Sequence, residues 1–297
     1  MTLPLFGSQA AGEQNSSAAA ERARIERTAV PREYLMCSPD YFDVTYAINA
    51  WMRPGVKVDR DLTLRQWRQL RDTYRELGHV VHEVTPEPGL PDMVFAANCA
   101  VMVDGEILGA RFRHPERAAE APAYRRWFEA SGVGTFHEPE AHNEGEGDFA
   151  VVGDTVLAGT GYRTDHAAHA EAQELFGRPV ISLKLLNPSY YHLDVALFAL
   201  DDRNIAYYPG AFTDGSLRTL QRLYPEAIVV SNEDAEAFGL NSISDGKNVV
   251  VAEDAVGLIA QLTERGYNTI PIDLSELRKA GGGAKCCTQE IRRSVSR

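Results

Sequence analysis

Two adjacent cysteines close a glycine-rich run near the C-terminal end of the sequence, at Cys286 and Cys287 in "GGGAKCCTQE". A thiolate is a strong nucleophile, but a free thiol is only a few per cent ionised at neutral pH and needs an activating neighbour. His192 and Asp194, in "YYHLDVALF", offer an imidazole and a carboxylate for that purpose. A cysteine with a histidine and carboxylates is the combination that nucleophilic catalysis uses. These residues therefore indicate thiol chemistry, provided that the fold brings them together.

Further acidic and amide side chains also stand at the start of apolar stretches. Asp92 and Asn98 occur in "GLPDMVFAANCA", and Glu144 occurs in "HNEGEGDF". Carboxylates gathered around one pocket repel one another unless a cation lies between them. A planar guanidinium, with its five N–H donors, fits carboxylates in bidentate geometry. The set therefore favours a cationic substrate of the guanidino type.

The elements that must position these residues follow a repeating pattern. An apolar strand, an acidic turn and a second apolar strand recur at 98–111, 148–163 and 194–210. The turns contain Asp104, Asp154 and Asp201. Acidic turns between alternating apolar runs indicate β-hairpins. A fourth hairpin is expected at 248–262, although the second half of that segment has the pattern of a helix start.

Helical patterns fill the intervals between the hairpins, and several end at a glycine, which is a common stop signal. They cover residues 63–78, 115–132, 165–177 and 215–225. The unit is therefore ββαβ, repeated about five times, and stacked units that share one core predict a closed, pseudo-symmetric ring. An ordinary doubly wound α/β sheet is the alternative, but its parallel units rarely carry hairpins.

A ring of repeats would also bring the polar residues into one site. Equivalent ends of the units meet near the axis of such a ring. The residues that this arrangement would gather are Asp92, Asn98, Glu144, His192, Asp194 and Cys286. The candidate nucleophile and the candidate cation-binding carboxylates would then belong to the same pocket.

Length and composition describe a protein with a sizeable core. The chain has 297 residues, 44% of them hydrophobic, and no apolar run long enough to span a membrane. Residues 1–30 lack the pattern of a secretory signal and predict a flexible tail before a single domain over 31–297. The net charge of −12 argues against nucleic acid and anionic membranes as partners. Four cysteines without a disulfide framework favour a cytoplasmic location.

At these motifs, over roughly residues 34–290, the sequence resembles the guanidino-group modifying enzymes, which include arginine deiminase, dimethylarginine dimethylaminohydrolase, arginine dihydrolase and the amidinotransferases. "HLD" is similar to the family's catalytic histidine and guanidinium-binding aspartate, here His192 and Asp194. "GGGAKCCT" is similar to the run that ends in the nucleophile, here Cys286, and "EGEGD" is similar to its second acidic motif. The resemblance implies a five-bladed α/β propeller, the pentein fold, which agrees with the ring of repeats.

The resemblance also implies residues that hold the substrate. "ERAAEA" and "GYRTD" are similar to segments with arginines that bind the substrate's carboxylate, here Arg117 and Arg163. Phe95 and Asn98 in "FAAN", Asn49 in "DYFDVTYAINAWM" and Asp92 complete the expected substrate-binding set. No cofactor or metal is implied, the expected partner is a small molecule, L-arginine or a substituted arginine, and a homo-oligomer is possible.

Two departures from the deiminase pattern are similar to the arginine dihydrolase branch. Asn98 stands where deiminases and dimethylaminohydrolases usually have an aspartate, and Glu144 lies four residues before Asp148 instead of three. We therefore expect hydrolysis of arginine to ornithine, carbon dioxide and two ammonia through a covalent cysteine intermediate. Glu144 is taken as the catalytic acid, with Glu146 as the alternative.

Other functions stay open at this point. Dimethylarginine hydrolysis and arginine deimination would both give citrulline, amidino transfer is a weaker rival, and a non-catalytic protein of this fold could bind a guanidino ligand. Individual residues also have plainer interpretations. Asp148 could bind only backbone amides, and Arg117 could be a solvated helix charge. His166 and His169 are spaced like metal ligands, but a zinc site would need more donors.

Overall fold

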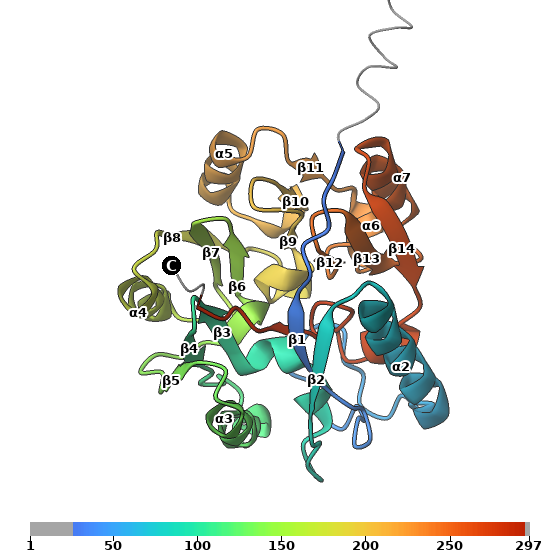
Figure 1. The fold of residues 1–297 in the computed structure, drawn as a ribbon. Helices are drawn as coiled ribbons and strands as arrows, with labels where there is room; N and C mark the ends of the chain where they lie inside the picture. The colour runs from blue at the N-terminus through green and yellow to red at the C-terminus, as the bar shows by residue number, and fades with distance from the viewer. Residues whose placement is uncertain (1–25, 295–297) are drawn as a thin grey trace, which may run out of the picture.

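A computed structural model describes residues 26–294, in which five three-stranded sheets stand around a central axis with helices on the outside (Figure 1). In every sheet the middle strand pairs antiparallel with one neighbour and parallel with the other. This is the five-bladed α/β propeller of ββαβ units that the sequence predicts, and it is distinct from a single doubly wound sheet.

Four blades are each made from consecutive segments of the chain. The first blade contains β3 (Ala100–Val103), β4 (Glu106–Gly109) and β5 (Thr135–His137). The second contains β6 (Phe149–Val152), β7 (Thr155–Thr160) and β8 (Val180–Lys184). The third contains β9 (Leu197–Ala199), β10 (Ile205–Tyr207) and β11 (Ile228–Val229). The fourth is β12 (Ile243–Ser244), β13 (Asn248–Ala252) and β14 (Asn268–Ile272).

The fifth blade joins the two ends of the described chain. It contains β1 (Glu33–Cys37), β2 (Val80–Val84) and β15 (Gln289–Glu290). Tyr34 pairs with Glu290 and Leu35 with Gln289 in antiparallel register. Because β15 takes the place that the first strand of each hairpin takes elsewhere, the ring is closed by the segment that immediately follows Cys286.

Each parallel pair is connected through a helix on the outer side of its blade (Figure 1). These helices are α2 (Arg60–Glu76), α3 (Glu120–Ser131), α4 (His166–Phe176), α5 (Asp214–Leu223) and α7 (Val256–Glu264). Two short helices, α6 (Asn232–Glu236) and α8 (Ser275–Arg278), flank the fourth blade in the chain. The helices predicted at 63–78, 165–177 and 215–225 match α2, α4 and α5 within a few residues.

The segment 248–262 is not a hairpin, and the helix start noted in its second half is confirmed. That half is α7, and β13 instead pairs antiparallel with β12, which precedes it. The β12 strand has only two residues, and so short an apolar segment gives almost no periodic signal. The helix predicted at 115–132 begins late: residues 115–119 contain a 3₁₀ turn, η3 (Pro115–Arg117), and α3 covers Glu120–Ser131.

The hairpin turns lie at one end of the inner strands, and the candidate site residues lie at the other end. Asp104 and Gly105 both adopt positive φ, 50° and 88°, as a tight Asp-Gly hairpin turn requires. At the opposite end, 3₁₀ turns precede the inner strands: η1 (Pro91–Val94) and η2 (Ala96–Cys99) before β3, η4 (Gly145–Gly147) before β6, and η6 (Leu193–Val195) before β9.

Only the end of the predicted N-terminal tail falls within the described residues, since residues 1–25 lie outside them. Arg27 donates a hydrogen bond to the carbonyl of Arg265, and the amide of Val30 donates to the carbonyl of Asp245. Within residues 26–294 no helix is long and apolar enough to cross a membrane. The cytoplasmic location stays a prediction.

Candidate active site

Cys286 is held at the propeller axis by an aspartate and an asparagine. Its Sγ donates to Oδ2 of Asp194 at 3.2 Å and accepts from Nδ2 of Asn241 at 3.1 Å. Oδ1 of Asn241 accepts from the Cys286 amide at 3.0 Å, and Nδ2 also donates to the Asp194 carbonyl. Asn241 therefore fixes both the sulfur and the backbone around it, with all three residues buried.

The electrostatics at the sulfur favour protonated groups when the pocket holds no cation. Burial, followed by the adjacent carboxylate, raises the pKa of the Cys286 thiol well above its ordinary value. Burial also raises the pKa of Asp194 to about 7, although the hydrogen bond from Cys286 opposes that shift. A bound cation would stabilise both the thiolate and the carboxylate, and would lower both pKa values.

The glycine run before Cys286 allows close packing at the pocket. Gly281 has a φ of 82°, in the left-handed region that favours glycine, and its carbonyl accepts from the Tyr191 hydroxyl at 2.8 Å. A Cβ at Gly282 would lie 2.2 Å from the Phe95 ring, and one at Gly283 would lie 2.9 Å from Oδ1 of Asn241. The run is therefore needed to seat Phe95 and Asn241 against the loop that carries the sulfur.

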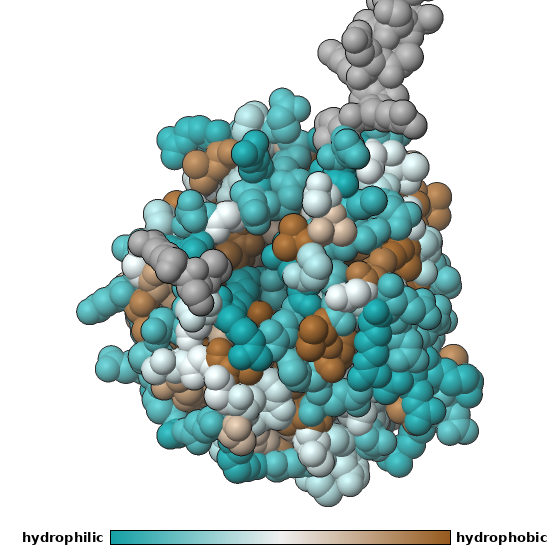
Figure 2. Space-filling model, in the orientation of Figure 1, coloured by the Kyte–Doolittle hydropathy of each residue, from teal (hydrophilic) through white to brown (hydrophobic). Residues whose placement is uncertain are grey.

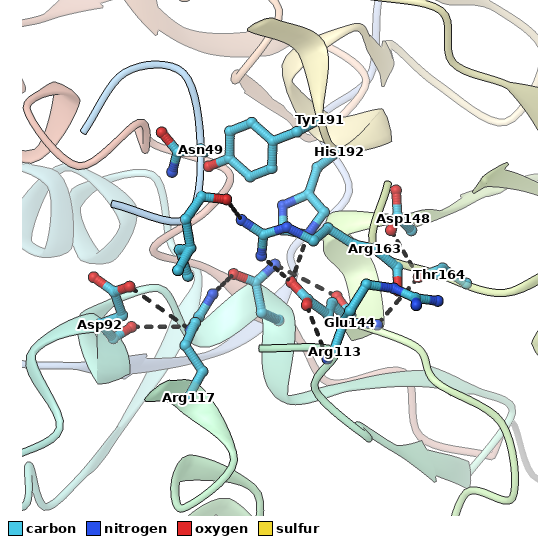
Figure 3. Close-up of polar contacts among 12 residues, drawn as sticks. Asn49, Asp92, Arg113, Arg117, Glu144, Asp148, Arg163, Thr164, Tyr191 and His192 are labelled. Atoms are coloured by element: carbon cyan, nitrogen blue, oxygen red, sulfur yellow. Dashed lines mark hydrogen bonds and ion pairs between the residues drawn. The ribbon is translucent and has the colours of Figure 1, made fainter. Parts of the chain in front are cut away.

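A second cluster joins His192, Glu144 and Arg163 (Figure 3). Oε2 of Glu144 lies 2.8 Å from Nε2 of His192 and 2.8 Å from NH1 of Arg163. Burial alone would raise the pKa of Glu144, but Arg163 and His192 outweigh it and hold that pKa well below its ordinary value. Nδ1 of His192 is buried and has no hydrogen-bond partner among the described residues. One ring nitrogen of His192, Nε2, thus contacts an ionised carboxylate, and the other, Nδ1, is free for proton transfer.

The two glutamates of "EGEGD" have different surroundings. Glu144 contacts His192, whereas Glu146 forms ion pairs with Lys285 and Arg292. Asp148 accepts from the Leu193 amide at 3.0 Å and from the Thr164 hydroxyl at 2.7 Å, which is the backbone-binding interpretation of this residue. Burial raises the pKa of Asp148 to about 6. Of the three acids, Glu144 is the one that contacts the imidazole.

Asn98, Asp92 and Arg117 form a third cluster beside Cys286. NH1 of Arg117 donates to Oδ1 of Asn98 at 2.6 Å, and NH2 donates to the Asp92 carbonyl at 3.2 Å. Arg117 is also paired through two hydrogen bonds with Glu120 and is only 3% exposed, so it is not a solvated helix charge. Oδ2 of Asp92 accepts from the Tyr46 hydroxyl at 2.9 Å, while Oδ1 is buried without a partner among the described residues.

A narrow pocket connects these clusters. Its walls include Cys286 and six residues predicted to bind the substrate, namely Asn49, Asp92, Phe95, Asn98, Arg117 and Arg163. The pocket has only about 10 Å³ of free space, so an arginine-sized ligand can enter only if a wall moves. Ile48 and Asn49 on one wall belong to the irregular segment 38–59, which is tied across the site by Arg163 NH2 to the Ile48 carbonyl.

A larger cavity opens at the other end of the axis. Figure 2 shows the face of the molecule hollowed at its centre, where the cavity of roughly 350 Å³ lies between the inner strands. Its lining includes Glu146, Lys285 and Arg292, and Asp194 borders it as well. Asp194 therefore lies between this axial cavity and the sulfur that faces the narrow pocket.

The structure brings the predicted site residues to one region, with two differences from the expected contacts. Among the described residues, Cys286 forms hydrogen bonds with Asp194 and Asn241, and His192 with Glu144, so the sulfur and the imidazole are not hydrogen-bonded to each other. Arg163 also donates two of its five N–H groups within the protein, to the Glu144 carboxylate and the Ile48 carbonyl. Its role with a substrate carboxylate stays a prediction that its remaining donors allow.

Sequence reasoning missed Asn241 and Glu120. Asn241 stands just before β12, the position that the other site residues take before their inner strands, so the repeat logic contained the signal. Asn241 was not predicted because β12 was not recognised as a strand. Glu120 follows Arg117 by three residues, a spacing that pairs side chains on one helical face, but η3 and α3 form separate turns.

The other three cysteines and the pair His166 and His169 occupy structural positions. Cys37, Cys99 and Cys287 are buried. His166 and His169 both contact the Ser182 hydroxyl, at 3.2 and 2.8 Å. Across residues 26–294 there is no cluster of three or more histidine, cysteine or carboxylate side chains arranged to hold a metal ion.

The family model for eukaryotic N,N dimethylarginine dimethylhydrolases matches residues 39–293 of this chain. An N(G),N(G)-dimethylarginine dimethylaminohydrolase of Mycobacterium tuberculosis is 49% identical over 268 residues, which cover 89% of this chain and 87% of the relative. The bifunctional arginine dihydrolase/ornithine cyclodeaminase AgrE of a Nostoc species is 35% identical, and the match covers 88% of this chain but 38% of that longer protein.

Solved structures give the same likeness in three dimensions. The N-terminal domain of ArgZ, a cyanobacterial arginine dihydrolase, was solved as a cysteine-to-serine variant bound to substrate. It superposes with a TM-score of 0.86 and 32% identity, over 89% of this chain and all of that domain. A dimethylarginine dimethylaminohydrolase adduct superposes with a TM-score of 0.73 at 18% identity, which shows a shared fold.

Proposed function

We propose that this chain, which belongs to the dimethylarginine dimethylaminohydrolase family, is an arginine dihydrolase. The family consists of hydrolases that act on the C–N bonds of linear amidines. The proposed reaction converts L-arginine and two waters to ornithine, carbon dioxide and two ammonia. The observation that carries the choice is the Asn98 amide, which lies in the pocket beside Cys286 with its oxygen bound to Arg117.

Two carboxylates with unused oxygens suit the guanidinium of the substrate. Oδ1 of Asp92 and Oδ1 of Asp194 are both buried without partners among the described residues, and a buried polar atom without a partner is costly. A guanidinium has only hydrogen-bond donors, so it could donate to both oxygens and replace the hydrogen bonds that they lack in the unliganded site. Binding would also lower the pKa of the Cys286 thiol and produce the thiolate where it is needed.

The first half of the reaction uses the sulfur and the imidazole. The Cys286 thiolate forms a bond with the central guanidino carbon, and one terminal C–N bond breaks as His192 protonates the departing ammonia. Neutral His192 then takes a proton from water, whose oxygen attacks the amidino carbon, and the C–S bond breaks to leave a ureido group. Glu144, which is ionised, accepts a hydrogen bond from Nε2 of His192 and holds the ring with Nδ1 free for proton transfer.

The second half requires that the neutral ureido group stay bound. The oxygen of Asn98 accepts from Arg117 and one N–H of its Nδ2 is donated to the Glu144 carbonyl, so the amide offers its remaining N–H to the ligand. A ureido oxygen accepts such a bond, whereas an aspartate at this place would repel it. A second attack by Cys286 releases ammonia, and hydrolysis of the resulting thiocarbamate gives a carbamate that loses carbon dioxide to form ornithine.

Dimethylarginine hydrolysis is the second candidate, because 49% identity to a protein of that name covers most of both chains. The free space of about 10 Å³ admits neither substrate unless a wall moves, so the choice between the two candidates rests on the Asn98 amide in the pocket wall.

One assay on the purified protein separates the candidates. It is incubated in turn with arginine, citrulline and dimethylarginine, and ammonia, citrulline, ornithine and dimethylamine are quantified. Ornithine and two ammonia from each arginine are expected. Dimethylamine from dimethylarginine, with arginine unused, would overturn the proposal, and citrulline as the sole product from arginine would reduce it to a deiminase.

A further inference from the structure

Glu120 lies outside the pocket and pairs with Arg117, which lines it. Its carboxylate accepts from Nε and NH2 of Arg117 at 2.9 and 2.8 Å, and it is 1% exposed. This fork-to-fork geometry leaves a single orientation for the guanidinium. NH1 of Arg117 is thereby directed to Oδ1 of Asn98.

The contact with Arg117 decides which end of the Asn98 amide faces the ligand. A guanidinium has no acceptor, so the Asn98 group that meets Arg117 must be the oxygen. The Nδ2 end lies on the other side and donates one N–H to the Glu144 carbonyl at 3.4 Å. A Cβ built on Gly147 would lie 2.2 Å from Nδ2 of Asn98 and 3.2 Å from Nδ1 of His192, so Nδ2 is on the side of the imidazole.

Without Glu120, Arg117 has another carboxylate within reach. Its Nε lies 4.0 Å from Oδ2 of Asp92, whose second oxygen has no partner among the described residues. A buried guanidinium that loses its counter-ion moves towards the nearest negative charge. That movement would release Oδ1 of Asn98 and let the amide rotate.

We propose that Glu120 is a positioning residue that, through Arg117, holds the Nδ2 side of the Asn98 amide towards the substrate and so commits the bound ureido group to the second hydrolysis. The inference rests on the proposed arginine dihydrolase function and names what sets its product. Glu120 does not touch the reacting atoms. It acts on whether citrulline is retained or released.

The test compares Glu120→Gln with Glu276→Gln. Glu276 is a second buried carboxylate that is bound through both oxygens to a cation three residues away, Lys279, outside the pocket. Both variants lose the charge of a buried carboxylate that pairs with a cation, so both should unfold at a lower temperature. Only Glu120→Gln should raise the ratio of citrulline to ornithine formed from arginine, by about tenfold or more. Its kcat/KM for added citrulline should fall further than its kcat/KM for arginine.

Arg117→Lys provides a second variant if Glu120→Gln does not fold. A lysine keeps the charge but cannot bind Glu120 and Asn98 with a fixed fork, so the same change in products is expected. If a folded variant loses activity on arginine and citrulline in equal proportion, with an unchanged product ratio, the positioning role is refuted. Absence of ornithine from the wild-type reaction would instead refute the dihydrolase function, and both ideas with it.

Discussion

The sulfur of Cys286 lies 3.2 Å from Oδ2 of Asp194, a carboxylate whose other oxygen has no partner among the described residues. Burial raises the pKa of both groups in the unliganded site, and the carboxylate raises the pKa of the thiol further, so the nucleophile is held in a protonated and unreactive form. A guanidinium that binds Asp194 would remove this inhibition. The geometry thus links substrate binding to the activation of the thiol.

Cys286 and Cys287 should differ sharply despite being adjacent. Cys286→Ala should lower kcat by at least about 10³-fold, because the covalent step is lost. Cys287→Ala should keep the activity within a few-fold and lose stability of about 1 kcal/mol, because it removes one buried atom from the core. Steady-state rates with thermal unfolding check both. Comparable inactivation by the two substitutions would contradict the assignment of the nucleophile.

Substrate binding should tighten as the pH rises through the pKa of Asp194. Its folded pKa is raised to about 7, so below that pH the carboxylate is protonated and must lose a proton before it pairs with the cation. In an inactive Cys286→Ser variant, the Kd for arginine should weaken by about tenfold for each pH unit below that pKa. Calorimetry in buffers of different ionisation enthalpy would detect the released proton. A Kd that does not change between pH 5 and 8 would exclude this coupling.

The raised pKa of Asp194 also determines how the stability of the unliganded protein changes with pH. Because the folded pKa of Asp194, about 7, lies above the ordinary value of 3.8, its contribution to stability is full below the unfolded pKa and is lost progressively as the pH rises to about 7. Arginine should therefore raise the unfolding temperature of the Cys286→Ser variant more at pH 8 than at pH 6. Asp194→Asn in the same background serves as the control and should remove this difference.

Arg163 should matter most for substrates that carry an α-carboxylate. Arg163→Gln also removes a partner of Glu144, so the rate should fall for every substrate. The informative quantity is the preference for arginine over agmatine, which lacks the carboxylate, in kcat/KM. We expect this preference to fall by about tenfold or more in the variant, as one charge-assisted contact is lost. An unchanged preference would mean that Arg163 serves Glu144 alone.

Gly147 should tolerate no side chain. A Cβ there would lie 2.2 Å from Nδ2 of Asn98, so Gly147→Ala should displace the amide and lower kcat by about 10²-fold. Gly215→Ala is the matched control, because it adds the same atom in α5 with no heavy atom within 4 Å. The control should keep full activity and gain slight stability from the helix preference of alanine. Equal activity of the two variants would place Asn98 outside the reaction.

The repeats and their polar ends were readable from the sequence because each used local patterns. Alternating strands, acidic turns and helices ending at glycine predicted the blades, and equivalent strand starts predicted that Asp92, Glu144, His192 and Cys286 would gather. What the sequence could not provide was pairing between distant side chains. The carboxylate partners of Arg117 and Arg163 and the hydrogen bonds to the sulfur depend on side-chain directions that no local pattern contains.

The short strands β12 and β15 were not predicted from the sequence for a different reason. β12 has two residues and β15 has two, so their place in the ring is set by the longer strands on which they pack. Asn241 was hidden by the first of these. The choice between Glu144 and Glu146 was likewise open, since two residues of one turn differ only in which neighbour they meet: His192 for one, and Lys285 with Arg292 for the other.

The most direct test of the account is the stoichiometry of the Asn98→Asp variant on arginine. The wild-type protein should release two ammonia and one ornithine for each arginine consumed, because Asn98 retains the ureido group for a second attack. The variant should release one ammonia and accumulate citrulline, since a carboxylate at this position repels the neutral ureido oxygen. If the variant still releases two ammonia and ornithine, the role given to Asn98 is contradicted.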